Sequence, residues 1–280
     1  MLTSGRYCLH IDGKHKIHHG KWMLVTIGTH DLRLDKVKNK ITHSFRPLVY
    51  QFVKQQESEE SVRMLCHAVN LLAHARFGTF LNPGVVNMDH SNGFRRGVLD
   101  VWPSAGINTC WPHLRRKVAQ GEYLSTTHTF FKSLCAIMQA IHLSQSEDMH
   151  DLLIKWGGVE MDLKVQKDKK LRTLWNEYFV QPWSCWSIGL HLDTPLNISN
   201  NQPIESWHRT VMRVLQRSLK GSTAAVLEHS FPKVVHRDGA RCRISSCITL
   251  VSCMYHNTYH NTYHACITTR ITTRIMHVSQ

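Results

Sequence analysis

The sequence predicts an α/β protein, in which helices flank a mixed sheet and an all-helical insertion precedes the last helix of the core. Two observations carry this prediction. Short apolar strands alternate with helical segments over residues 6–122, whereas residues 123–179 place apolar side chains at helical spacing.

Two strands open the chain. Apolar and polar residues alternate over residues 6–12, and a nearly continuous apolar run follows at residues 22–28, as in a strand buried on both faces. The polar stretch between them, residues 14–20, predicts a hairpin turn. Asp12 is therefore expected at the end of the first strand.

A third strand and a helix come next. Residues 45–53 predict the strand, and Pro47 indicates that it is an edge strand or carries a bulge near its start. Short connections between these three strands favour an antiparallel meander. The polar segment 55–61 predicts the start of a helix, with Glu59 and Glu60 in or near the first turn.

A short buried strand, residues 85–89, ends in Asp89. The sequence then predicts a helix over residues 91–99 and another short strand over residues 107–110. Pro112 suits the start of a basic helix, because a proline is tolerated in the first helical turn.

The chain divides into four regions by these patterns. They are residues 1–122, the first part of the sheet core; residues 123–199, a mainly helical insertion; residues 200–235, a closing helix that carries Glu205; and residues 236–280, a tail. Exact four-residue repeats in the tail, Tyr-His-Asn-Thr and Ile-Thr-Thr-Arg, predict a low-complexity, disordered segment.

Composition narrows the class of protein. Lys and Arg number 34 against 20 acidic residues, a net charge of +14, which favours a polyanionic partner, most simply a nucleic acid. The nine cysteines form no Cys-x-x-Cys pair, which favours a reducing compartment. No apolar run approaches the length of a membrane span.

Three carboxylates stand at ordered places along the chain: Asp12, Asp89 and Glu205. Each has a simpler explanation. Asp12 with Gly13 is also a turn signal, Asp89 is also a candidate cap for the helix that follows it, and Glu205 would complement the dipole of its own helix. Together, their order is that of an RNase H-like core with a D-D-E triad.

Such a triad needs carboxylates because Mg²⁺ and Mn²⁺ prefer oxygen ligands. Two ions can activate the attacking oxygen and stabilise the leaving oxygen of a phosphodiester. The sequence therefore predicts a two-metal site that takes Mg²⁺ or Mn²⁺, with zinc as a possibility that no second ligand pair supports.

Several segments resemble the transposase domain of Mutator-like elements, the MULE transposase domain. The segments are residues 7–13 around Asp12, residues 45–50 with the polar stretch 55–61, residues 85–89 with 101–103 and 110–116, and residues 200–206 around Glu205. The resemblance covers residues 5 to 230.

By that resemblance, Asp12, Asp89 and Glu205 would be the catalytic metal ligands. Cys110 and His113 would be the Cys-x-x-His pair of the family, whose spacing suits a metal half-site; a structural role, or a place near DNA, stays open. Four arginines are candidates for phosphate contact, with a solvated basic face as the alternative: Arg115, Arg116, Arg209 and Arg213.

The resemblance implies a nuclear DDE-type transposase that cleaves and joins DNA strands, with DNA as partner and a homo-oligomer as a further option. Two alternatives stay open. One is a catalytically inactive, transposase-derived DNA-binding or transcription-regulatory protein. The other is a fragment of a decayed element, which the repeats after residue 255 favour.

Overall fold

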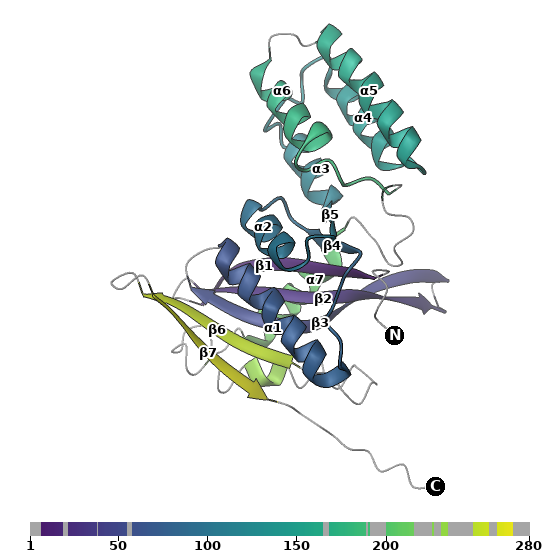
Figure 1. Cartoon of the computed structure of the whole chain (residues 1–280). Coiled ribbons are helices and arrows are strands. Elements are labelled where there is room, and N and C mark those ends of the chain that lie inside the picture. Colours follow the sequence, from purple (N-terminus) through teal and green to yellow (C-terminus); the bar gives the residue numbers. More distant parts are fainter. Residues whose placement is uncertain are drawn as a thin grey trace.

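The computed structural model describes most of the chain. The described residues are 7–18, 22–37, 39–54, 58–164, 168–188, 190, 200–215, 226, 231–234, 249–257 and 262–270. Strands and helices alternate in the α/β manner that the sequence predicts, and Figure 1 shows the helices on both sides of a single twisted sheet.

Seven described strands form the sheet, in the order β5-β4-β1-β2-β3-β6-β7. Their bounds are β1 Cys8–His18, β2 Trp22–Asp35, β3 Lys40–Lys54, β4 Val85–Met88, β5 Gly106–Thr109, β6 Thr249–Asn257 and β7 Thr262–Arg270. β1, β2 and β3 pair antiparallel, which confirms the meander, whereas β4 is parallel to β1 and β5 is parallel to β4.

The first strand is longer than the sequence predicts. β1 continues to His18, with Gly13 paired to Val25 and Lys14 to Leu24, so Asp12 lies inside the strand and not at its end. Polar side chains from Lys14 onward indicate a turn, but ladder hydrogen bonds to the apolar β2 extend the strand.

A bulge interrupts the β2–β3 ladder near Pro47, as predicted. Ile27 pairs with Val49 but Gly28 pairs with Pro47, so β3 has one extra residue at this point. Gly28 is required here because a Cβ would meet the carbonyl oxygen of Arg46 at 2.2 Å.

One face of the sheet packs against α1 (Glu59–Phe77) and α2 (Asn92–Val101). Ser58 caps α1 in a capping box with Ser61, and Gly78 ends it in the left-handed conformation. Both helices confirm the sequence prediction, and their apolar stripes build the first core with β1, β2 and β3.

The opposite face packs against α7 (Gln202–Leu215). Trp207 stacks on Tyr50 of β3 with ring centroids 5.2 Å apart, and Ile204, Val211 and Leu215 are completely buried. Pro203 lies in the first turn, as expected. This helix therefore lies directly over the meander.

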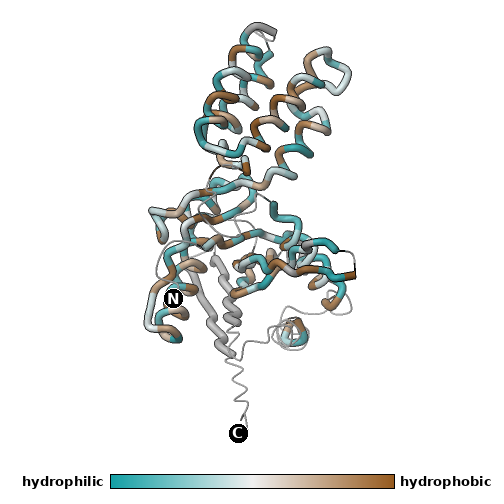
Figure 2. Tube along the Cα trace, turned by 90° about the vertical axis from the view of Figure 1, so that its right-hand side faces the viewer, coloured by the Kyte–Doolittle hydropathy of each residue, from teal (hydrophilic) through white to brown (hydrophobic). Residues whose placement is uncertain are grey.

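The helical segment between β5 and α7 forms its own core. Its elements are α3 Trp111–Ala119, α4 Phe131–His142, α5 Glu147–Lys164, α6 Lys169–Trp175 and the π-helix η1 Asn176–Val180. Figure 1 shows α4, α5 and α6 standing together beyond the β5 edge of the sheet, and Figure 2 shows hydrophobic positions recurring along them. Trp111, Trp183 and Trp186 are buried among these helices.

The tail differs from the sequence prediction. Instead of a disordered segment, the structure places β6 and β7 there as an antiparallel pair, with β6 parallel to β3. Thr, Tyr and Ile make up five of the nine residues of β7, and β6 contains Thr, Val and Tyr; these residue types favour extended backbone, so strand propensity contributes to the difference.

Candidate metal centre

A single row of residues crosses the sheet beneath α7. Cys8, Leu9 and His10 of β1 pair with Val85, Val86 and Asn87 of β4 in parallel, an offset of 85 − 8 = 77 residues. Asp12 and Asp89 are separated by the same 89 − 12 = 77 residues. Continued by two residues, this register would bring Asp89, which follows β4, next to Asp12, and the charge of Asp89 contributes to the raised pKa of Asp12.

The row extends to both sides of this pair. β5 follows β4 with an offset of 21 residues, which brings Cys110 next to Asp89, and the amide of Cys110 donates to the carbonyl of Met88. On the other side, Asp12 pairs with Thr26 of β2. The order across the sheet is thus Cys110, Asp89, Asp12 and Thr26.

Helix α7 and the residue before it bring three polar side chains to this row or beside it. Asn201, Glu205 and His208 are spaced four and three residues apart, so they share one helical face. Asn201 precedes the helix, and its carbonyl accepts the first helical hydrogen bond, from the amide of Glu205. Asn201 contacts Cys110 and Asp89, His208 contacts Asp12 and Thr26, and Glu205 contacts His113, which lies beside the row.

His208 meets Asp12. Its Nδ1 lies 3.2 Å from Oδ2 of Asp12, and its Nε2 lies 3.2 Å from the hydroxyl of Thr26. His208 is 1% exposed and the Asp12 side chain 10%. Burial raises the pKa of Asp12, with a smaller contribution from the nearby charge of Asp89, and His208 opposes both.

His113 lies between the other two carboxylates. Its Nδ1 lies 2.8 Å from Oδ1 of Asp89, and its Nε2 lies 3.1 Å from Oε1 of Glu205. Asp89, Cys110 and Glu205 raise the pKa of His113 to about 12, against a smaller opposing effect of burial. Contact with His113 is also the largest cause that lowers the pKa of Glu205.

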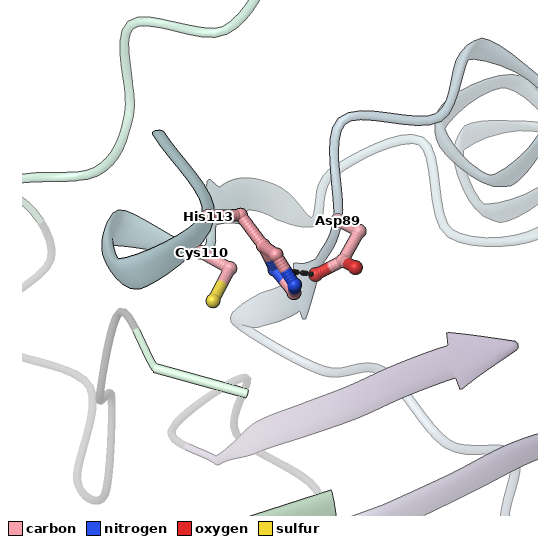
Figure 3. Close-up of side chains that lie close together, drawn as sticks. All are labelled: Asp89, Cys110 and His113. Carbon is pink, nitrogen blue, oxygen red and sulfur yellow. Dashed lines mark ion pairs between the residues drawn. The ribbon is translucent and has the colours of Figure 1, made fainter. Parts of the chain in front are cut away.

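Cys110 and His113 reach the same point because α3 begins there. Cys110 immediately precedes α3 and His113 lies in its first turn, so the Cys-x-x-His spacing turns both side chains to one side. Figure 3 shows the ring of His113 pointing to Asp89, which comes from the segment after β4, and Cys110 on the other side of His113. The sulfur, a ring nitrogen and a carboxylate oxygen lie within 4.8 Å of one another.

Several polar atoms here are buried without a well-directed hydrogen bond. They are Nδ1 of His113, Oε1 of Glu205, Oδ1 of Asn201 and Nδ1 of His208. Three of the four have an ion-pair neighbour at short distance, but the angles are poor for hydrogen bonding. A bound water or a divalent cation could satisfy buried polar atoms of this kind.

The structure answers two of the simpler explanations. Asp89 does not cap α2, because the hydroxyl of Ser91 accepts the hydrogen bond from the amide of Phe94. Asp12 and Gly13 form no turn, because both lie in β1. Asp89 does stand directly after β4, as predicted.

The four predicted arginines are exposed, but only one has a described relation to the centre. Arg116 is near enough to Glu205 to contribute to its lowered pKa. Arg115 instead lies near Cys135 and His142 of α4. Arg209 and Arg213 lie on the exposed side of α7.

Sequence reasoning missed His208 and Asn201. The chain has 21 histidines, so no single one is informative, although the i, i+4, i+7 spacing with Glu205 would have singled out these two residues.

No protein-family model matches the chain, and no curated protein matches it. In the described part of the chain, no helix combines the length and apolar character that crossing a bilayer requires.

Proposed function

We propose that the chain is a DDE-type transposase catalytic domain with an RNase H-like fold, which cleaves and joins DNA strands with Mg²⁺ or Mn²⁺. The observation that carries this proposal is that the charge of Asp89, which directly follows β4, acts on the buried Asp12 of the adjacent parallel strand β1. The antiparallel meander, continued by parallel strands beside β1, agrees with an RNase H-like core.

The residues fit a hard divalent cation. Asp12 lies in β1 and Asp89 directly follows the adjacent parallel strand β4, and the carboxylate oxygens of both residues are the ligand type that such an ion prefers. Burial makes the ionised form of Asp12 costly, and a bound cation would offset that cost. When bound, such ions would activate the attacking water or DNA 3′-hydroxyl and stabilise the leaving oxygen.

Other residues would position the reacting groups. His208 contacts the Asp12 carboxylate with one ring nitrogen and the hydroxyl of Thr26 with the other, which fixes the orientation of its ring. Helix α7 also places Glu205 in contact with His113. Arg116 is the described arginine best placed to contact a phosphate beside the centre. A chain with net charge +14 would attract DNA over its whole surface.

A plasmid-nicking assay with Mn²⁺ tests the proposal. We expect Asp12→Asn and Asp89→Asn to lower the nicking rate on the order of 100-fold or more, because each removes a charged ligand. Asp148→Asn is the matched control, since Asp148 is exposed on α5, and it should nick like the wild type. Nicking by Asp89→Asn at the wild-type rate would refute the proposal.

The same samples distinguish the proposed transposase from the alternative, a DNA-binding protein without catalytic activity. A wild-type protein that shifts labelled duplex DNA in a mobility assay, but does not nick it with Mn²⁺ or Mg²⁺, would favour the non-catalytic DNA-binding protein.

A further inference from the structure

We infer that Asp89, Cys110 and His113 form a three-ligand site for a borderline-soft divalent ion such as Zn²⁺ or Co²⁺, with Glu205 in the outer shell and not among the ligands. A thiol, an imidazole and a carboxylate lie within 4.8 Å of one another, each offering one donor atom. Thiolate and imidazole favour zinc-like ions, whereas Mg²⁺ prefers oxygen alone.

The number of donors matches an open site. Structural zinc sites use four protein ligands, whereas catalytic sites use three and keep the fourth position for water or substrate. In the described residues the cluster has three members, and His113 and Asp89 are one-fifth to one-third exposed. Such a site would be reachable by a ligand from outside.

Each of the three donors has a partner at the start of α7. The amide nitrogen of Asn201 donates to Sγ of Cys110 at 3.3 Å, and its side-chain Nδ2 donates to Oδ1 of Asp89 at 3.0 Å. Nε2 of His113 faces Oε1 of Glu205 at 3.1 Å. Metal-bound histidines commonly donate their other ring N–H to a carboxylate, which fixes the ring orientation.

The poorly directed contacts point to an ion as well. Nδ1 of His113 is 2.8 Å from Asp89 yet lacks a well-formed hydrogen bond. Asn201 is 0% exposed, and its Oδ1 has no hydrogen-bond partner among the residues that the structure describes. A buried amide oxygen of this kind is costly unless water or an ion satisfies it.

This assignment gives Glu205 a role different from that of the third transposase carboxylate: it would orient His113 and would not bind the ion. Asp89 would belong both to this site and to the proposed Asp12–Asp89 pair, because a carboxylate has two oxygens. The inference does not depend on DNA cleavage.

Cobalt spectroscopy tests the site without an activity measurement. The full chain, freed of metal, is titrated with Co²⁺ while the visible d–d bands and the near-ultraviolet thiolate-to-cobalt band are recorded. We expect one equivalent to bind with both features present, and Zn²⁺ to displace it. The absence of a thiolate band in the wild type would overturn the inference.

Variants assign the ligands. Cys110→Ser should abolish the thiolate band, whereas Cys135→Ser, at an exposed cysteine of α4, should keep it. Glu205→Gln should keep the band but weaken Co²⁺ binding by roughly 10- to 100-fold, as expected for an outer-shell partner. A band that survives Cys110→Ser, or disappears in Glu205→Gln, would contradict the assignment.

The nicking assay keeps this inference separate from the proposed function. If Cys110→Ser loses the band but still nicks DNA with Mn²⁺, the soft-metal site and the nuclease are independent. If the wild type binds Co²⁺ through sulfur but does not nick, the site stands and the nuclease proposal fails.

Discussion

At the scale of single residues, His208 is the buried side chain that connects helix α7 to strands β1 and β2 of the sheet. It is 1% exposed and joins Asp12 on one side and Thr26 on the other. Asp12 is the most buried of the three carboxylates, and its other described partner is the amide of Gly13, which donates to Oδ1 at 2.8 Å. Removing the imidazole would leave the buried carboxylate with this backbone hydrogen bond but without its ion-pair partner.

We therefore expect His208→Ala to lower the free energy of unfolding by about 3 kcal/mol, because breaking a buried pair leaves an uncompensated charge. Urea denaturation at neutral pH measures the change. His67→Ala is the control, since His67 is exposed on α1, and it should change stability little. Equal midpoints for His208→Ala and the wild type would show that Asp12 does not need His208.

A second buried histidine predicts a pH dependence. His30 is 2% exposed, stacks on His10 with ring centroids 3.6 Å apart, and neither ring nitrogen has a hydrogen bond among described residues. Burial, and to a smaller extent His43, lowers the pKa of His30 to about 4. The unfolded chain takes up this proton first, near its ordinary pKa of about 6.5.

The contribution of His30 is therefore present above about pH 6.5 and lost as pH falls toward 4, by up to about 3 kcal/mol. His30→Phe keeps a ring that can stack and removes the titration. Urea unfolding at several pH values should give a shallower loss of stability for His30→Phe than for the wild type. Parallel pH curves would contradict this account.

At the scale of elements, two glycines in helices predict opposite effects of one substitution. Gly97 lies where α2 crosses α1, and a Cβ would meet the carbonyl oxygen of Glu59 at 2.6 Å and the amide of Arg63 at 2.9 Å. Gly158 on α5 would place its Cβ 3.6 Å from the Trp175 ring, an ordinary contact.

Gly97→Ala should destabilise the protein by roughly 1–3 kcal/mol, because backbone atoms must move apart. Gly158→Ala should stabilise it by roughly 0.5–1 kcal/mol through helix propensity alone. Thermal and urea unfolding of the two variants measures both. The same sign of change in both proteins would mean that the α1–α2 crossing is not as close as described.

Register explains what sequence reasoning found at this scale and what it missed. Apolar patterning located β2, β4, α1 and α2, and it placed Asp89 directly after β4. It ended β1 too early, because the paired, extended part of the strand is polar. The 77-residue spacing of Asp12 and Asp89 was visible, but its meaning depends on the register of β1 with β4, which no local pattern shows.

At the scale of the whole molecule, charge and shape set how a nucleic acid would approach. The chain carries a net charge of +14, and the helical segment stands beyond the β5 edge, next to the start of α3 where the candidate centre lies. Arg116 is the exposed cation whose charge reaches this centre. A charge change close to the centre and an equal charge change far from it can therefore distinguish a local phosphate contact from non-specific attraction of DNA.

Arg116→Gln should weaken DNA binding and reduce the slope of log affinity against log salt by roughly 0.9, the value for one lost phosphate contact. Lys169→Gln makes the same charge change at an exposed position of α6 and should affect the slope less. Fluorescence anisotropy at several salt concentrations measures both. Identical slopes for the two variants would assign the effect to net charge alone.

The central claim is that a divalent cation binds where α7 meets the row formed by β1, β4 and β5. Asp89 belongs to both of the proposed metal sites. Calorimetric titration of the wild type and of Asp89→Asn with Mn²⁺ and with Zn²⁺ tests it most directly. The account predicts saturable binding of at least one of these ions to the wild type and its loss in Asp89→Asn. Equal binding by the two proteins, or none by the wild type, would contradict it.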